Sequence, residues 1–225
     1  MIASAFLILL KMNKIEQTIS FVKQELRNAE SGHDWFHIER VYKNALNIIE
    51  KEDANKEVVL YAALLHDIAD SKFHQGDETV GPKKAASFLE SISVNPEVIN
   101  HVVKIIENIS FKGGNFQRNF SSIELNIVQD ADRLDAIGAI GIARTFNYGG
   151  YKNNSIHDPE VGPKMNMSKE MYKNHKGTTI NHFYEKLLLL KDLMNTQTGK
   201  EIAKQRHDFM LLFLSQFYSE WDGEL

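Results

Sequence analysis

The sequence predicts a single all-α domain, a helical bundle, and three observations support this prediction. Apolar residues recur at intervals of three and four through most of the chain, which is the spacing of one face of a helix. No segment alternates apolar and polar residues as a half-buried strand would. The 225 residues are 43% hydrophobic and 25% charged, as in ordinary globular proteins, and neither a repeat nor a linker divides them. We therefore expect one domain over residues 12–225.

Five helices are expected in the first half of the chain. The first is amphipathic, because its apolar residues recur at three and four positions. Ser31, followed three residues later by Asp34, is typical of a capping box at the start of the second helix. Pro96 is typical of a first helical turn and is expected to open the fifth helix. The predicted ranges are 15–26, 32 to about 51, 56–69, 80–91 and 96–109.

The second half is expected to be built around one long helix over residues 123–148. Its residues are apolar almost all round, which is typical of a buried helix, and Gly138 and Gly141 would allow close packing. Residues 149–167 lack periodicity and predict a long loop, of the kind that is usually a functional lid or disordered. Two further helices, over about 175–194 and 199–221, are expected to close the chain.

Composition and charge exclude several classes of site and partner. The chain has no cysteine, so any metal must be bound by His, Asp or Glu. A net charge of −4 argues against general binding of nucleic acid or of an anionic membrane. The apolar run of residues 2–10 is too short to span a membrane and lacks the features of a secretory signal. We assign residues 1–11 no function, with translation from Met12 as an alternative, and expect a cytoplasmic protein.

Four His-Asp dipeptides occur in the chain, and their surroundings distinguish them. His157-Asp158 precedes a proline in the predicted loop and is expected to be a solvated turn. His207-Asp208 lies in the last predicted helix beside basic residues and is expected to belong to a polar face. Asp34 has the capping role given above, which leaves the role of His33 open. His66-Asp67 is the pair that indicates a functional site.

The surroundings of His66-Asp67 favour a metal site. The helix face behind His66 is apolar, and burying an aspartate there is costly unless it is paired or binds a metal. Asp70, three residues on, places a second carboxylate on nearly the same side, which a cation between the two would stabilise. The alternative is a helix end at which His66 satisfies backbone carbonyls and both aspartates are solvated.

Further ligand candidates lie on two other predicted helices. His37 follows His33 by one helical turn and shares its face. Asp130, Asp132 and Asp135 interrupt an otherwise apolar helix, so at least one should face a polar cavity; the alternative is ion pairing with Arg133 and Arg144. Imidazole and carboxylate ligands suit one divalent ion, Mn²⁺ first and otherwise Mg²⁺, Fe²⁺, Co²⁺, Ni²⁺ or Zn²⁺.

These residues resemble the H…HD…D signature of the HD-domain metal-dependent phosphohydrolases, an all-α superfamily. The likeness covers residues 14–222. Longer strings around these residues also resemble a small bacterial branch that includes a Bacillus-type nucleoside triphosphate pyrophosphohydrolase. The strings that carry it are Gly32-His33-Asp34-Trp35-Phe36-His37, Leu65-His66-Asp67-Ile68-Ala69-Asp70, Asp130-Ala131-Asp132-Arg133-Leu134-Asp135 and His182-Phe183-Tyr184-Glu185-Lys186-Leu187.

The resemblance implies a role for each matching residue. A metal ion would be held by His37, His66, Asp67 and Asp132, and Asp70 would handle the proton of the attacking water. Relatives carry a histidine before the Ser-Phe that is Ser110-Phe111 here, where this chain has Asn108-Ile109, so we expect one ion rather than two. Cations are also needed to hold the phosphates, and the substrate-binding candidates are Lys112, Arg133 and His33. Tyr148 and Tyr151 would stack on a base or pack at a helix end.

The expected reaction is hydrolysis of a nucleotide, and the first choice is cleavage of a nucleoside or deoxynucleoside triphosphate to monophosphate and pyrophosphate. A 5′-nucleotidase or another phosphomonoesterase or phosphodiesterase with the same site is the alternative among enzymes. A catalytically silent nucleotide-binding scaffold is the alternative from another class. The expected partner is a small-molecule nucleotide, with no nucleic acid and no membrane, and a homodimer stays open.

Overall fold

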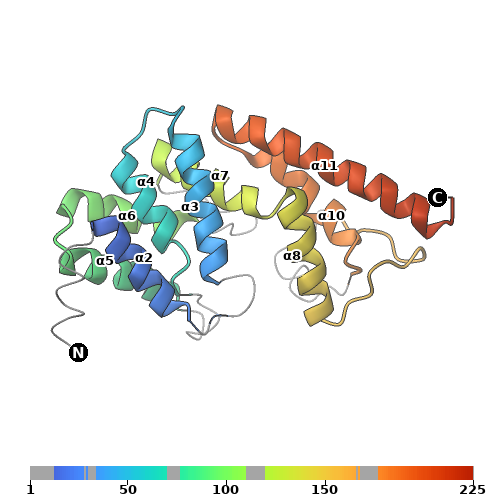
Figure 1. The fold of residues 1–225 in the computed structure, drawn as a ribbon, viewed down its shortest axis with the longest axis horizontal. Helices are drawn as coiled ribbons and strands as arrows, with labels where there is room; N and C mark the ends of the chain where they lie inside the picture. The colour runs from blue at the N-terminus through green and yellow to red at the C-terminus, as the bar shows by residue number, and fades with distance from the viewer. Residues whose placement is uncertain are drawn as a thin grey trace. The chain divides into compact units, whose positions relative to one another are not determined.

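The computed structural model describes residues 13–27, 29, 34–69, 77–109, 120–165, 167 and 177–224. The protein is all-α, as the hydrophobic periodicity predicts, and the described residues contain no strand. Figure 1 labels the helices along the chain. They are α2 (Lys14–Glu25), α3 (Trp35–Ile49), α4 (Lys56–Leu65), α5 (Val80–Ser91), α6 (Pro96–Ile109), α7 (Ile123–Asp135), α8 (Gly138–Tyr151), α10 (Asn181–Glu185), the 3₁₀ helix η2 (Leu187–Leu193) and α11 (Gln197–Trp221).

The helices gather in two compact units. Of the described residues, unit 1 contains α2 to α6 and the first part of α7, and unit 2 contains the rest of α7 with α8, α10, η2 and α11. The chain passes from one unit to the other within helix α7, between Val128 and Gln129, and no linker sequence marks the change. The assignment of residues 12–225 to one domain stays a prediction.

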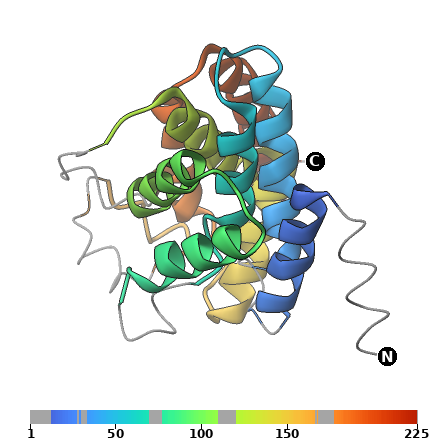
Figure 2. The same cartoon turned by 90° about the vertical axis from the view of Figure 1, so that its left-hand side faces the viewer.

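Helix α4 forms the centre of unit 1. Every residue from Val58 to Leu65 is buried, because α4 packs against α2, α3 and α6 (Figure 2). Helix α5 packs against α6, and the bounds of both helices agree with the prediction. The buried faces of α3 and α6 carry apolar residues at helical spacing, among them Ile38, Val41, Val102 and Ile105.

The start of α3 differs from the prediction. Asp34, rather than Ser31, caps the helix, because its carboxylate accepts a hydrogen bond of 3.0 Å from the backbone N–H of His37. An aspartate with extended backbone angles is a strong N-cap, and it shifts the first helical residue to Trp35. Ser31 itself lies outside the described residues. His37 is therefore the third residue of α3 and lies in its first turn.

The end of α4 also differs from the prediction, which continued the helix to Ala69. The helix ends at Leu65, and residues 66–69 form a turn and a bend. The ring of His66 hydrogen-bonds the carbonyl of Ala63 at 2.9 Å. The last turn of a helix leaves its carbonyls without intrahelical partners, and this ring nitrogen satisfies one of them.

The predicted long helix over residues 123–148 is wrong. It is two helices, α7 and α8, separated at Ala136 and Ile137, and α8 continues to Tyr151. Ile137 is extended and Gly138 has φ of +75°, a left-handed conformation that glycine adopts without strain. Arginines bond the last carbonyls of α7: Arg144 donates to Asp135 O at 3.1 Å and Arg206 to Leu134 O at 2.5 Å.

Unit 2 is built around α11, which packs against α8 and η2. Its buried residues include Ile180, Phe183, Leu190, Met210 and Leu214. The predicted helix over 175–194 is instead the short α10 followed by η2, because the backbone at Lys186 leaves the helical region. The last helix begins two residues earlier than predicted and ends at Trp221 as predicted. No helix among the described residues combines the length and the apolar character that crossing a membrane requires.

Candidate metal centre

Helices α3 and α4 bring two imidazole rings together in unit 1. His37 is 3% exposed and lies in the first turn of α3, where the Asp34 cap holds its backbone. His66 follows the last turn of α4 and is partly exposed. The centroids of the two rings are 5.5 Å apart and the ring planes meet at 68°. Residues 29 positions apart in the sequence thus form one pair of nitrogen donors.

The hydrogen bond at His66 determines the tautomer of its ring. A carbonyl oxygen accepts only, so Nδ1 carries the proton that it donates to Ala63 O. In the neutral ring the lone pair is then on Nε2. Metal-binding histidines commonly show this arrangement, in which the second ring nitrogen is bonded to a backbone carbonyl. His66 therefore does bond a carbonyl at the end of α4, as the alternative interpretation of this residue predicts. This bond is compatible with a role as a metal ligand through Nε2.

Partners distinguish the three aspartates of α7. Asp130 is fully buried and accepts hydrogen bonds from Asn195 and Thr196, with Arg133 3.7 Å away. Asp135 is 1% exposed and pairs with Arg144 at 2.5 Å. Ion pairing with Arg133 and Arg144, the alternative stated for these acids, is thus confirmed for Asp130 and Asp135.

Asp132, His37 and His66 form a group that could hold a metal ion. Each offers one ligand atom, and these three atoms lie within 4.8 Å of one another. His37 is buried, and the other two residues are partly exposed, as a site open to substrate requires. Two imidazoles and a carboxylate suit a divalent transition ion and leave further coordination positions for solvent or substrate. The donor set therefore fits the ion expected from the sequence.

The remaining predicted site residues fall into two groups. Asp67 lies in the turn after α4, is partly exposed, and is not part of the three-residue group. His33, Asp70 and Lys112 lie outside the described residues. Their roles, and that of Asp67 as a fourth ligand, stay predictions.

Arg133 has partners within unit 2. Its Nη1 donates to Leu193 O at 2.5 Å and lies 3.7 Å from Asp130 Oδ1. The sequence suggested a phosphate contact for Arg133 and gave no sign of its bond to Leu193. Nothing near residue 195 in the sequence carries a motif that would have shown it.

Two of the other His-Asp pairs differ from their predicted surroundings. His157 is not solvated: its ring contacts those of Phe217, Tyr218 and Trp221, with centroids 5.4 to 5.9 Å apart for the first two and 4.8 Å for the third. His207 is partly buried, so only Asp208 of this pair lies on the expected exposed face.

Tyr148 and Tyr151 are 57% and 70% exposed, and Lys152 Nζ lies 5.6 and 5.3 Å from their ring centroids. They are therefore accessible rather than packed at the helix end.

Comparison with known proteins identifies the family. The HD-domain model matches residues 35–137. YpgQ of Bacillus subtilis is 38% identical over 216 residues, which cover 95% of this chain and 96% of that protein. A crystal structure of an HD-superfamily hydrolase from Bacillus thuringiensis is 46% identical, with a TM-score of 0.75, and covers 93% of this chain and 97% of its own.

The crystal structure of Bacillus subtilis YpgQ in complex with ADP is 35% identical, with a TM-score of 0.72, and covers 92% of this chain and 97% of its own. The family match spans α3 to α7 and includes His37, His66 and Asp132. Together with the helical fold, these likenesses show that the chain belongs to the HD-domain superfamily of metal-dependent phosphohydrolases.

Proposed function

We propose that this protein hydrolyses nucleoside or deoxynucleoside triphosphates to the monophosphate and pyrophosphate, with one divalent ion, preferably Mn²⁺. The observation that carries the proposal is the group formed by His37, His66 and Asp132. Membership of the HD superfamily supplies the reaction class, which is hydrolysis of a phosphate bond. The relative YpgQ, crystallised in complex with ADP, supports a nucleotide as the substrate.

The proposed metal ligands are His37, His66 and Asp132, with Asp67 as the fourth. A divalent ion bound there would neutralise charge on phosphoryl oxygens and make a water molecule more acidic. The chain's own contribution is orientation. Asp34 holds the first turn of α3 through the His37 N–H, and the Ala63 carbonyl holds the His66 ring. Preorganised donors cost no rearrangement during the reaction, which is why such support matters.

Other residues would act on the substrate itself. Asp70 follows Asp67 by three residues and is proposed to accept the proton of the attacking water. Lys112, Arg133 and His33 are proposed to neutralise the phosphates that do not react, since most of the barrier to phosphoryl transfer is overcome by positioning and charge. Arg133 also bonds Leu193 O, and a guanidinium has several N–H donors, so this bond does not exclude a substrate contact.

A nucleotide panel tests this proposal. Mono-, di- and triphosphates in the ribo and deoxy series are incubated with Mn²⁺, and pyrophosphate is resolved from orthophosphate among the products. The expected result is pyrophosphate with the matching monophosphate, and loss of turnover in Asp132→Asn. Asp192→Asn is a matched control, because Asp192 is an exposed aspartate at the end of η2 and should leave turnover unchanged.

The products distinguish the alternatives. Orthophosphate released from monophosphates would replace the proposal by a 5′-nucleotidase with the same ligands. Absence of turnover with every nucleotide, together with retained Mn²⁺ binding, would favour a silent nucleotide-binding protein. Equal turnover in Asp132→Asn and the unaltered protein would show that the proposed metal group is not the catalytic site.

A further inference from the structure

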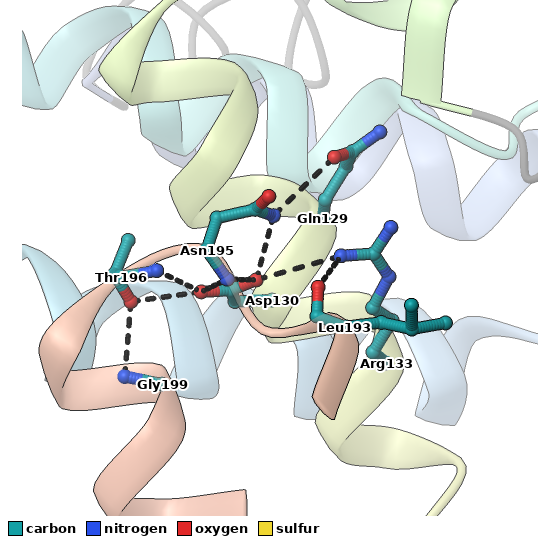
Figure 3. Close-up of polar contacts among 7 residues, drawn as sticks. All are labelled: Gln129, Asp130, Arg133, Leu193, Asn195, Thr196 and Gly199. Carbon is teal, nitrogen blue, oxygen red and sulfur yellow. Dashed lines mark hydrogen bonds and ion pairs between the residues drawn. The ribbon is translucent and has the colours of Figure 1, made fainter. Parts of the chain in front are cut away.

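A polar cluster in unit 2 surrounds the buried Asp130, two residues before the proposed metal ligand Asp132. We call it the Asp130 clamp. Its members come from α7, from the segment that leaves η2 and from the first turn of α11 (Figure 3). They are Gln129, Asp130, Arg133, Leu193, Asn195, Thr196 and Gly199.

The carboxylate of Asp130 is fully buried and well supplied with donors. It accepts from the backbone N–H of Asn195 at 2.9 Å and from the N–H of Thr196 at 2.7 Å. The side-chain amide of Asn195 and the hydroxyl of Thr196 donate to it at 2.9 and 2.8 Å. A buried carboxylate is tolerated when donors surround it in this way, and such charge-assisted bonds are stronger than neutral ones.

The clamp fastens one face of α7 to the start of α11. Thr196 is the N-cap of α11, and its hydroxyl also accepts from the Gly199 N–H at 2.9 Å. A Cβ on Gly199 would lie 2.5 Å from Asp130 Oδ2, so only glycine permits this approach. Arg133 adds a second attachment from the same helix, through Leu193 O.

The position of Asp132 on α7 connects the clamp with the metal group. At about 100° per residue, Gln129, Asp130 and Arg133 lie within an arc of about 100°, whereas Asp132 is about 200° from Asp130. Asp130, at the centre of the clamp, and the proposed ligand Asp132 therefore lie on nearly opposite faces of one helix. Whatever sets the rotation of α7 about its axis also sets the direction of the Asp132 carboxylate.

We infer that Asp130 is a positioning residue for the metal site, because the clamp sets the rotation of α7 and thereby the direction of Asp132. This inference rests on the metal role of Asp132 in the proposed function. It assigns Asp130 no contact with the metal or the substrate.

The test measures Mn²⁺ binding without any nucleotide. Each variant is freed of metal with a chelator and titrated with Mn²⁺, free Mn²⁺ being followed by electron paramagnetic resonance. Circular dichroism and Tm are recorded so that every titration is made on folded protein. Asp130→Asn is expected to raise the Kd for Mn²⁺ about tenfold, as loss of a supporting group does in other metal sites. Asp132→Asn should raise it at least as much.

Two comparisons separate positioning from general stability and from charge. Glu124→Gln removes another buried carboxylate of α7, one that accepts from Asn55 N–H at 3.0 Å, and it should lower Tm without changing the Kd. Thr196→Val removes two clamp hydrogen bonds but no charge, and should raise the Kd, whereas Thr196→Ser keeps the hydroxyl and should restore it.

Each outcome decides one point. A folded Asp130→Asn protein with the Kd of the unaltered protein, beside a weakened Asp132→Asn, would overturn the inference and leave the proposed function standing. An unchanged Kd in Asp132→Asn would overturn the metal site itself. If Glu124→Gln and Asp130→Asn weaken Mn²⁺ binding equally, the clamp acts on the metal site only through the general stability of the fold. If Asp130→Asn does not fold, equal Kd values for Thr196→Val and Thr196→Ser would overturn the inference.

Discussion

Asp130, Asp132 and Asp135 are one residue type within six positions of one helix, yet their surroundings differ. Asp130 accepts from backbone and side-chain donors of residues 195 and 196, and Asp135 pairs with Arg144. Asp132 offers its carboxylate beside two imidazoles. Spacing on the helix separates Asp130 from the other two, whereas Asp132 and Asp135, three residues apart, lie on nearly the same side of α7. Their different partners come from the residues that each of them meets, among them Arg144 for Asp135.

At the residue scale, His182 makes stability depend on pH. Burial, together with the nearby Lys186 ammonium, lowers the pKa of His182 from 6.5 to about 4. Between these two values the unfolded chain binds more protons than the folded one. The free energy of unfolding therefore falls as the pH is lowered from about 6.5 to about 4, and the contribution of His182 is complete above this range.

Replacing His182 should flatten this dependence. In His182→Gln the side chain no longer titrates. Between pH 7 and pH 4.5 the free energy of unfolding should therefore fall by up to about 3 kcal/mol less than in the unaltered protein, and Tm should fall correspondingly less. Thermal unfolding followed by circular dichroism at several pH values measures the difference. Parallel curves for the two proteins over that range would show that His182 is not the group responsible.

A second prediction at this scale concerns Asp70. If its carboxylate handles the proton of the attacking water, Asp70→Asn should lower kcat by about 10² or more while the Kd for Mn²⁺ stays the same. Steady-state kinetics and Mn²⁺ titration of the same preparation measure both quantities. Unchanged kcat would exclude the proton-transfer role, and a lost Mn²⁺ site would assign Asp70 to the ligands instead.

At the scale of elements, the break between α7 and α8 depends on Gly138. Its φ of +75° is unfavourable for a residue with a side chain, and a Cβ there would lie 2.9 Å from Cγ of Arg206. Arg206 in turn bonds the carbonyl of Leu134 near the end of α7. Gly138 thus permits the turn that follows α7 and leaves room for the Arg206 side chain, which bonds one of the last carbonyls of α7.

Gly138→Ala should accordingly destabilise the protein by about 1–3 kcal/mol, from backbone strain and from displacement of Arg206. Gly150→Ala is the matched control: it lies in the same helix, and a Cβ there would meet no atom within 4 Å. That substitution should be neutral or stabilising, since alanine favours helix more than glycine does. Urea denaturation compares the two, and equal effects would contradict the role given to Gly138.

At the scale of the whole molecule, metal binding should be linked to folding. An ion that binds only the folded protein stabilises it in proportion to the logarithm of its concentration, by about 2.7 kcal/mol at one hundred times the Kd. Free Mn²⁺ at that concentration should raise Tm by about 5–10 °C in a chain of this size. A chelator should reverse the increase.

Variants of the proposed ligands test whether Mn²⁺ raises Tm by binding at this site. His66→Gln and Asp132→Asn should show no rise of Tm with Mn²⁺, whereas the exposed Asp192→Asn should respond like the unaltered protein. Differential scanning calorimetry with and without the ion measures this. A full Tm rise in both ligand variants would place the bound Mn²⁺ elsewhere on the protein.

The sequence alone determined the all-α class, the bounds of α5 and α6, and the extent of α11 to within two residues. It also pointed to His37, His66 and Asp132 as ligand candidates. These features depend on local information: helical periodicity, a proline at a first turn, and polar residues in an apolar run. The end of α4 and the division of residues 123–148 were wrongly predicted, because a ring bonded to a carbonyl and one left-handed glycine end helices that the periodicity would continue.

Only the tertiary structure decided which of the three aspartates of α7 has which partner. Asp130 and Asn195 are 65 residues apart in sequence, and their hydrogen bonds exist because α7 and the start of α11 pack together. His157, predicted to lie in a solvated turn, instead contacts the rings of Phe217 and Trp221, because the segment after α8 lies against the end of α11. Local sequence indicates the helix propensity of a residue and its tendency to be buried or exposed. Long-range packing determines which donors surround a buried charge.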